Sequence, residues 1–494
     1  MKKNSFLYKC IPVAGIIFLI ACLPLFAQEA ERKAPVFNVD AQRIVQLALL
    51  NSLDIQIARF DTLIKKTELD SVQSLFDTFL NANIEYTNDE KDTPTTFSGT
   101  KNTSQMYSFS VDKKLPSGTK VDIEASNERT HTNSLFTTVN PAHEATMQLT
   151  LTQELGKNFF GLADRSGVQL TKIDIENTEY TSLSDIEDAL AKVLVSYWNL
   201  VLKKETLDIR REMREQADRL YKIYQEKFEL GMVETVDIAQ IRAHMKRLDT
   251  GVLNAELEEE TAKNDLLFLI NVEDLNVILS TQDILTFDTS FVDLYEKVTR
   301  AVHSRRDYQK IKNELKKYDI DLIVKQNALW PQIDLEASYT KNGINDVSRS
   351  AWGETTNRDQ DELFLGLTIR LSLENNEARS QLEATQLKKE QLLLMLKRVE
   401  RTILREINNQ VMTVNTLKNK VDLTRELVEF EEEKLQAEHK RLGWGRSNAD
   451  VMVRYEDDVL TARLDYATAL YRYRIESIEL ERLQNVLLNR YWIQ

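Results

Sequence analysis

Histidines and carboxylates are the side chains of this chain most suited to chemistry, and their spacing matches no known catalytic or metal site. The five histidines are His131, His143, His244, His303 and His439, with no His-x-x-x-His pair and no histidine–carboxylate cluster at ligand spacing. We therefore expect a surface role for each of them. No glycine-rich phosphate loop or nucleophile elbow occurs either. The sequence predicts no catalytic residue, no metal site and no cofactor, and hence a protein that is not an enzyme.

Two polar turns carry the most informative acids. The first turn surrounds Gly231 and ends at Asp237, and the second surrounds Gly443 and ends at Asp450. An acid that follows such a turn is favoured at the start of the next helix, because the free backbone N–H groups there attract negative charge. Capping is therefore the simplest interpretation of both aspartates.

Long helices must carry these turns. No glycine or proline lies between Gly167 and Gly231 or between Gly366 and Gly443, so an unbroken helix can lead into each turn. Residues 168–230 alone would span roughly 90 Å at ~1.5 Å per residue. A second helix runs back after each turn, which predicts helical hairpins at about 168–270 and 378–488. Helices this long do not fit one compact core, so the molecule must be elongated.

Segments of alternating polarity precede both hairpins. Residues 80–87 and 363–373 alternate between apolar and polar side chains with the period of two that is typical of strands. Four strands are predicted within about 79–155 and two within about 332–373. An arm at Arg32–Asn38 is predicted to be extended.

The order of helix, strands and helical hairpin occurs twice. A helix is predicted before each set of strands, from about Ala41 to Ser74 and from Leu294 to Ala328, and Tyr86-Thr87 matches Tyr339-Thr340. The first half is longer by about one extra strand hairpin, between Thr103 and His143. This internal similarity divides the chain into a first repeat, 28–291, and a second repeat, 292–494.

The first 27 residues look like an export signal. Lys2, Lys3 and Lys9 precede an apolar run that is too short and wrongly flanked for a typical spanning helix. One interpretation is cleavage after Ala27. The other is a bacterial lipobox that ends at Cys22 and leaves this cysteine lipidated. Cys10 and Cys22 are the only cysteines, so neither interpretation leaves a disulfide in the mature chain.

These features in this order resemble the TolC family of outer-membrane efflux proteins. The segments that carry the resemblance are Ser196-Tyr-Trp-Asn-Leu-Val201, Lys227-Phe-Glu-Leu-Gly231 with Val236-Asp237, Leu329-Trp-Pro-Gln-Ile-Asp-Leu335 and Leu371-Ser-Leu-Glu-Asn-Asn-Glu-Ala-Arg379. The resemblance implies an α+β, mostly α, fold: a trimeric transmembrane β-barrel continued by a long periplasmic α-helical barrel, with two structural repeats per protomer. The family usually has two strands per repeat. The extra hairpin therefore leaves open whether the barrel has eighteen strands or carries this hairpin outside it.

The resemblance also implies a function. Such a protein is the exit duct of a tripartite efflux or type I secretion system in the outer membrane of a Gram-negative-type bacterium. Its partners would be two further copies in a homotrimer, outer-membrane lipid, a periplasmic adaptor (membrane fusion) protein and an inner-membrane pump of RND, ABC or MFS type. Nucleic acid is excluded by the net charge of −14. The alternative is a coiled-coil scaffold without a pore, which predicts no lipid-facing strands and conflicts with the alternation at 363–373.

In the family, acids near the second turn ring the periplasmic entrance, select cations, and lie close to polar links that hold it shut. Asp450 aligns with the first such acid, whereas Val453 stands where the second is expected. Asp237, Arg446 and Tyr455 are the further candidates for the constriction and its links. The candidate adaptor contacts are Gly231, Met232, Val233, Gly443, Trp444 and Gly445. We expect the second-repeat hairpin to move more when the entrance opens.

Overall fold

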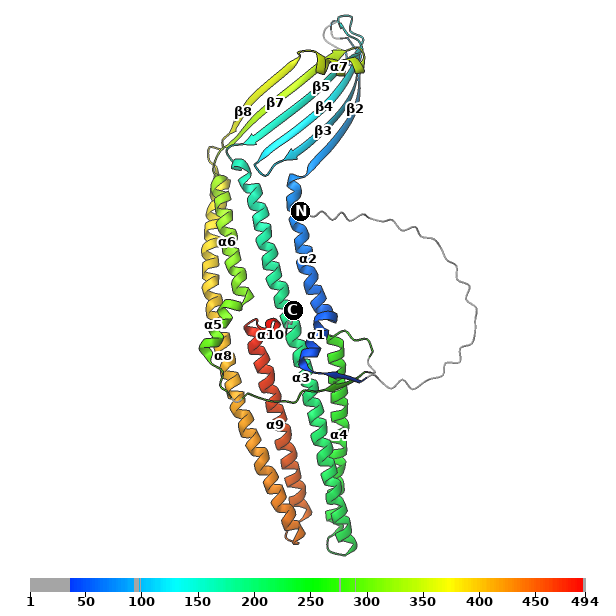
Figure 1. Ribbon diagram of the computed structural model, residues 1–494, viewed down its shortest axis with the longest axis vertical. Helices are drawn as coiled ribbons and strands as arrows, with labels where there is room; N and C mark the ends of the chain where they lie inside the picture. Colours follow the sequence, from blue (N-terminus) through cyan, green and yellow to red (C-terminus); the bar gives the residue numbers. More distant parts are fainter. Residues whose placement is uncertain (1–35, 93–96, 98, 275–276, 289, 492–494) are drawn as a thin grey trace, which may run out of the picture.

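A curved sheet at one end and long helices along the rest make up this elongated molecule (Figure 1). The computed structural model describes residues 36–92, 97, 99–274, 277–288 and 290–491. The predicted signal segment and Cys22 lie outside the described residues. Within those ranges, none of the helices combines the length and the apolar character that a membrane crossing requires.

Two helical hairpins form the long axis of the molecule. The first consists of α3 (Leu162–Glu229) and α4 (Thr235–Leu269), and the second of α8 (Asn376–Gly443) and α9 (Ala449–Leu483). Both α3 and α8 run for 68 residues without interruption, and α4 and α9 each have 35. At ~1.5 Å per residue, each long helix spans about 100 Å.

The helix that precedes each set of strands is broken in two, so the prediction of a single helix was wrong in both repeats. The first is divided into α1 (Ala41–Asn51) and α2 (Leu53–Gln73), and the second into α5 (Leu294–Ser304) and α6 (Arg306–Asn327). Ser52 (φ −59, ψ 127) and Arg305 (φ −66, ψ 122) leave the helical conformation at equivalent positions of the two repeats. The break lets α1 bury its apolar face against α3 while α2 continues along α3 toward the sheet.

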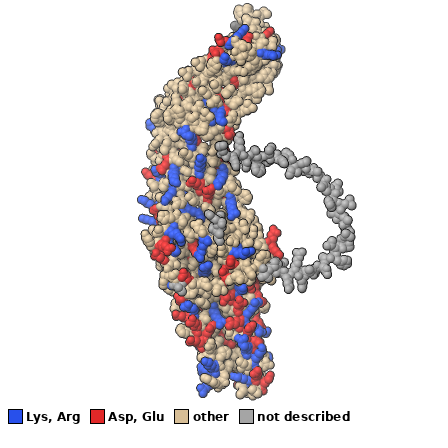
Figure 2. Space-filling model, viewed as in Figure 1, with Lys and Arg blue, Asp and Glu red and all other residues tan. Residues whose placement is uncertain are grey.

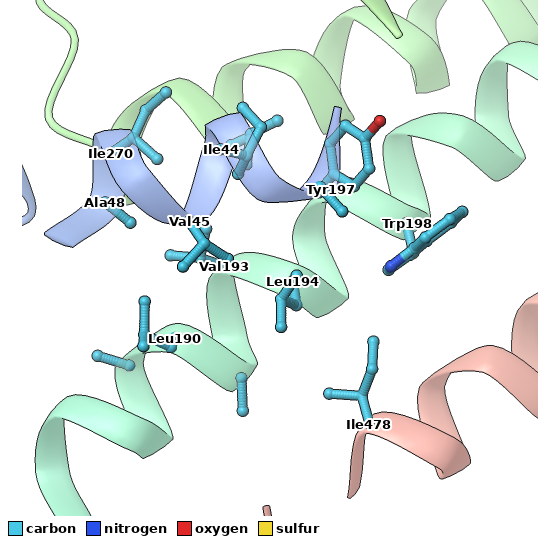
Figure 3. Packing of buried hydrophobic residues seen from close by; sticks show 14 of the residues in the cluster. Ile44, Val45, Ala48, Leu190, Val193, Leu194, Tyr197, Trp198, Ile270 and Ile478 are labelled. Carbon is cyan, nitrogen blue, oxygen red and sulfur yellow. The ribbon is translucent and has the colours of Figure 1, made fainter. Parts of the chain in front are cut away.

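The main hydrophobic core lies at mid-length, where both repeats meet. Ile44 of α1 and Leu194 and Tyr197 of α3 are fully buried there (Figure 3). Leu266 of α4 and Leu487 of α10 (Leu487–Tyr491) are fully buried in the same cluster. Burying one such side chain contributes about 1.5–3 kcal/mol. The described part of the predicted arm, residues 36–38, belongs to this region, since β1 (Val36–Val39) pairs in parallel with β6 (Ile278–Thr281).

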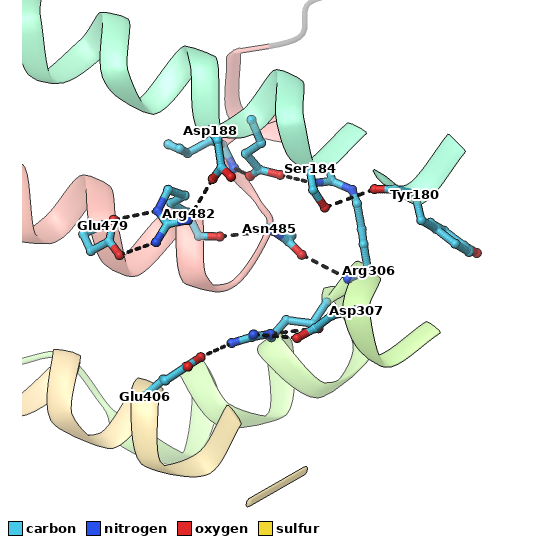
Figure 4. Close-up of polar contacts among 12 residues, drawn as sticks. Tyr180, Ser184, Asp188, Arg306, Asp307, Glu406, Glu479, Arg482 and Asn485 are labelled. Carbon is cyan, nitrogen blue, oxygen red and sulfur yellow. Dashed lines mark hydrogen bonds and ion pairs between the residues drawn. The ribbon is translucent and has the colours of Figure 1, made fainter. Parts of the chain in front are cut away.

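Buried and half-buried ion pairs join the two repeats beside this core (Figure 4). Arg306 of α6 forms a buried ion pair with Glu187 of α3, whose pKa is raised by burial and lowered in part by Arg306. The backbone N–H of Arg306 donates to Asn485 Oδ1 (3.0 Å), and Arg482 pairs with Asp188 (2.8 Å). Chain segments about 120 to 300 residues apart are thereby held in register.

Six antiparallel strands form one sheet in the order β2-β3-β4-β5-β7-β8. Their bounds are β2 (Thr78–Asp89), β3 (Asn102–Lys114), β4 (Thr119–Thr132), β5 (Ala142–Glu154), β7 (Gln332–Asn345) and β8 (Asp361–Arg370). Short helices lie beside them: η1 (Ser74–Phe76), η2 (Phe159–Gly161) and α7 (Ser348–Asn357). The extra hairpin, β3–β4, is inside the sheet between β2 and β5, so each chain supplies six strands. Leu371 and Leu373, predicted within the last strand, follow its end.

The strand register gives the sheet one apolar and one polar face. One row of paired residues crosses all six strands and is entirely apolar or aromatic: Leu80, Val111, Ile123, Leu149, Tyr339 and Leu363. The adjacent row points to the other face and is entirely polar: Asn81, Ser110, Glu124, Gln148, Thr340 and Glu362. Charged side chains are accordingly sparse over the middle of the sheet and dense over the helices (Figure 2).

Candidate functional site

The free ends of the two hairpins lie side by side at the end of the molecule farthest from the sheet (Figure 1). Each turn contains a glycine with a left-handed backbone, Gly231 (φ +70) and Gly445 (φ +70). Other residues adopt this conformation only at a cost, which accounts for glycine at both positions. A Cβ on either glycine would meet open space, so these positions depend on backbone conformation and not on close packing.

The two turns start their second helices differently. In the first turn, Asp237 Oδ2 accepts from the Glu234 N–H (3.0 Å), and Glu234 in turn caps the N–H of the third helical residue, which completes a capping box. In the second turn, Asn448 Oδ1 accepts from the Val451 N–H (3.0 Å). The Asp237 carboxylate is thus used to start α4, whereas that of Asp450 is not the cap of α9.

Asp450 instead takes part in a set of contacts between the two hairpins. Its Oδ1 accepts from Gln240 Nε2 of α4 (3.0 Å). Near the turns, Lys227 Nζ donates to the Leu442 carbonyl oxygen (3.2 Å). These polar contacts connect the first-repeat hairpin to the second-repeat hairpin at their free ends.

A buried histidine–carboxylate pair lies behind these contacts. His244 Nε2 of α4 is 3.2 Å from Glu456 Oε2 of α9, and both residues are 1% exposed. The surface role expected for His244 was therefore wrong, because the packing of α4 on α9 joins residues 212 positions apart. Asp457 Oδ1 is 3.7 Å from the other ring nitrogen. No group of three or more histidine, cysteine, aspartate or glutamate residues in the described ranges is arranged to hold a metal ion.

Apolar packing supports the same interface. Tyr224, Ile241, Met452 and Val453 are buried in one cluster between the hairpins. Val453, which replaces the second acid of the family pattern, is 5% exposed and cannot line an aqueous passage in this arrangement. Burial, together with the nearby charge of Asp237, raises the pKa of Tyr224 to about 12, so its hydroxyl stays protonated.

Arg446 and Tyr455 form no polar side-chain contact between the two hairpins, although Tyr455 packs against the apolar cluster. The Arg446 side chain is exposed, and its backbone N–H donates to the Arg441 carbonyl oxygen (2.9 Å). The Tyr455 ring faces Lys434 Nζ of α8 at 4.6 Å, within the same hairpin. Burial lowers the pKa of Lys434, but hydrogen bonds to Asp458 and Glu431 outweigh it and raise the pKa overall.

Apolar side chains at the hairpin ends point into solvent. Met232 and Trp444 are 71% and 69% exposed, and Leu230 and Val236 beside them are similarly exposed. Leu230 and Val236 were not among the predicted contacts, although their place beside the turn glycine could have indicated them. Val233 is half-buried and packs against the cluster between the hairpins. Exposed apolar groups gathered at one end of a molecule mark a contact surface for a partner.

Comparisons with known proteins agree with this architecture. Residues 298–486, which run from α5 to just beyond α9, match the family described as outer membrane efflux protein. The fold is similar to the CmeC outer membrane channel of Campylobacter jejuni (TM-score 0.64, 15% identity, 90% of this chain and 85% of that chain). It is also similar to the outer membrane protein VceC of Vibrio cholerae (TM-score 0.65, 13% identity, 90% of this chain and 95% of that chain). A third similar structure is the open state of the MtrE outer membrane channel of Neisseria gonorrhoeae (TM-score 0.64, 13% identity, 90% of this chain and 88% of that chain). No curated protein matches the chain by sequence.

Proposed function

We propose that this chain, which belongs to the outer membrane efflux protein family, is the outer membrane channel of a tripartite efflux system. Its sheet lies in the outer membrane and its helices extend into the periplasm. The family is one of transport ducts and not of enzymes. The observation that carries the proposal is the six-stranded sheet with one apolar and one polar face, placed above two hairpins of about 100 Å.

The sheet edges support a trimeric barrel. Within one chain, β2 and β8 are edge strands with unpaired backbone groups, and their Leu80 and Leu363 are 75% and 80% exposed. Lipid offers no hydrogen bonds to an open edge, so each edge must pair with another chain. When β8 of each copy pairs with β2 of the next, three copies close a barrel of eighteen strands. Its apolar row then faces lipid and its polar row faces the lumen. Barrels of this size enclose an aqueous channel.

The hairpins support a periplasmic duct with a docking end. Two hairpins from each of three chains form a helical barrel below the membrane, and the exposed apolar groups at its end contact a periplasmic adaptor. A separate inner-membrane pump supplies the energy. Transport through this protein is passive, and drug, metal or protein cargo is selected mainly by the pump.

Asp450 is the residue that we assign to the periplasmic entrance. Three copies around one axis form a ring of negative charge that attracts cations and disfavours anions. Opening moves the α8–α9 hairpin away from the α3–α4 hairpin, which breaks the Gln240–Asp450 and His244–Glu456 contacts.

Single-channel conductance in a planar bilayer tests this function. The purified trimer should show discrete openings that favour cations, and Asp450→Asn should lower the cation preference while preserving size and shape. Asp237→Asn is the matched control, because its carboxylate belongs to a capping box in the other hairpin. Equal loss of selectivity in both variants would contradict the assignment of Asp450. A trimer that never conducts, even with Glu456→Gln to weaken the closed interface, would contradict the channel itself.

A further inference from the structure

Helix α7 is an element that the proposed function leaves unexplained. It follows β7 at the end of the sheet farthest from the helices, and it packs on β5 and β7 (Figure 1). Ala351 and Thr355 on its inner side are both 0% exposed. Its approach to β7 is close, since a Cβ on Gly343 would lie 2.2 Å from the Ala351 carbonyl oxygen. The helix is thus a fixed part of the sheet and not a loose loop.

The strand register shows which face of the sheet α7 covers. Gly343 of β7 pairs with Ala145 of β5. Four residues along the same two strands, toward the long helices, Tyr339 pairs with Leu149. Side chains separated by an even number of residues in a strand share a face, so Gly343 lies on the face of the apolar row. Helix α7 therefore lies against the outside of the proposed barrel and not in its lumen.

The same register gives the height of α7 along the strands. Lys341 lies between Tyr339, which belongs to the apolar row, and Gly343. Its Nζ is 3.6 Å from Asp361 Oδ1. Beside α7 on this face, Asn127 Oδ1 is 3.2 Å from His143 Nδ1. At about 3.4 Å per residue, α7 lies ~14 Å from the apolar row. On β4, β5 and β7 the outward face thus changes from apolar to polar beside α7, whereas Ile84 and Tyr107 keep β2 and β3 apolar at the same row.

The side chains of α7 suit this border. Neighbouring helical residues differ by ~100° in direction, so Trp352 and Glu354 lie on opposite flanks of the buried Ala351–Thr355 stripe. Asn345 Nδ2, at the far end of β7, donates to Glu354 Oε1 (2.9 Å). Trp352 therefore occupies the flank opposite that contact. Tryptophan is enriched at membrane–water interfaces, because its ring is apolar and its N–H is polar.

We propose that α7 rests on the headgroup layer of the outer leaflet, with lipid headgroups as its partner. Three copies form an external collar that limits how deeply the barrel sits in the membrane. The collar rests on the proposed function, since it requires that the apolar face of the sheet be in lipid.

Spin labels on single cysteines can measure the depth of α7 in the trimer. Neither interpretation of the signal segment leaves a free thiol in the mature chain, so the background is clean. Trp352→Cys and the exposed Arg349→Cys report on α7, and the trimers are reconstituted into phosphatidylcholine vesicles. The controls are Leu365→Cys on the apolar face, Glu362→Cys on the polar face and Leu135→Cys, whose native side chain is 93% exposed in a loop. Collision rates with oxygen, which concentrates in lipid, and with a polar nickel chelate give the depth of each label.

The collar predicts that the oxygen-to-nickel collision ratio at Trp352→Cys lies several-fold below that of Leu365→Cys and several-fold above that of Leu135→Cys. Arg349→Cys should fall between Trp352→Cys and Leu135→Cys. Ratios at both α7 sites as low as those of the water-exposed Leu135→Cys and Glu362→Cys would place the helix clear of the lipid and overturn the collar. A low ratio at Leu365→Cys itself would instead overturn the membrane insertion of the proposed function.

Discussion

The two repeats match in their helices and differ in their strands. The helices α3 and α8 are both 68 residues long, and α4 and α9 are both 35. The first repeat nevertheless supplies four strands and the second only two. Helix length is thus the same in the two repeats, whereas the number of strands that each adds to the sheet differs.

A physical reason accounts for each half of this difference. The hairpins of both repeats must end at the same level, because their turns contact each other through Lys227 and Leu442. An added β-hairpin leaves and re-enters the sheet on the same side, so it changes the width of the sheet and no other connection. Its inner turn is also held in place, since Arg165 donates to the Pro116 carbonyl oxygen (2.8 Å).

Deletion of the extra hairpin, β3–β4, should have the largest effect among these tests of the difference between the two repeats. Removal of residues 102–132 takes out β3 and β4 and leaves β2 and β5 antiparallel, above helices α2 and α3 that already pack together. Because barrel diameter grows roughly linearly with strand number, the membrane pore should narrow by about a third. The size of polymer excluded from the outer mouth should fall, while the trimer still assembles.

An unchanged exclusion limit in the deletion variant would show that the hairpin does not line the barrel. A variant with only the exposed loop residues 135–138 removed is the control, and it should keep the original limit.

The junction between the repeats should be the next most sensitive region. Arg306→Ala leaves Glu187, which is 0% exposed, as an uncompensated buried carboxylate. Breaking one partner of a buried ion pair costs about 3–5 kcal/mol. Chemical denaturation of the detergent-solubilised trimer should show this loss, and Arg349→Ala on the surface of α7 should leave the midpoint unchanged. Similar midpoints for both variants would mean that the pair does not hold the repeats together.

The docking of the extra hairpin depends on one close approach. Gly118 has φ +74, and a Cβ there would lie 2.4 Å from the Gly161 backbone nitrogen. Gly118→Ala should cost about 1–3 kcal/mol of local stability, seen as faster hydrogen exchange in β3 and β4. Gly167→Ala is the matched control: its Cβ meets open space inside α3, so it should stabilise the helix by about 0.5–1 kcal/mol. Equal protection in the two variants would contradict the docked turn.

The smallest expected effect is the loss of a helix cap at the end of one hairpin or the other. Asn448→Ala removes the cap of α9 and should cost about 0.5–2 kcal/mol, confined to the first turn of that helix. Asp237→Ala should do the same for α4 by opening its capping box. Hydrogen exchange resolved to single peptides should show each loss in its own hairpin only. A change that spreads to both hairpins would mean that the ends are coupled through more than the contacts described.

Periodicity made the long helices and the strands predictable. The absence of glycine and proline over two long stretches identified α3 and α8, and strict alternation identified the six strands. The breaks at Ser52 and Arg305 were not predictable, because no proline or glycine marks them and tertiary packing of α1 and α5 causes them. Helix α7 was missed for a similar reason: its ten residues are too few for a clear helical period.

The candidate site was predictable in place but not in its contacts. The turn glycines and Asp450 located the hairpin ends from local pattern alone. The His244–Glu456 pair depends on how α4 packs on α9, which no local pattern records. The roles of Asp237, Arg446 and Tyr455 at the entrance stay predictions, although the structure gives the Asp237 carboxylate a capping contact.

The central claim is that three copies of this chain close one barrel by pairing β8 with β2 of the next copy. Electron cryo-microscopy of the purified trimer in lipid nanodiscs measures this directly, because strands and seams are visible in the map. We expect a closed wall of eighteen strands, six from each copy, with β8 hydrogen-bonded to a neighbouring β2. A wall of twelve strands with β3–β4 outside it, or a sheet that stays open at its edges, would contradict it.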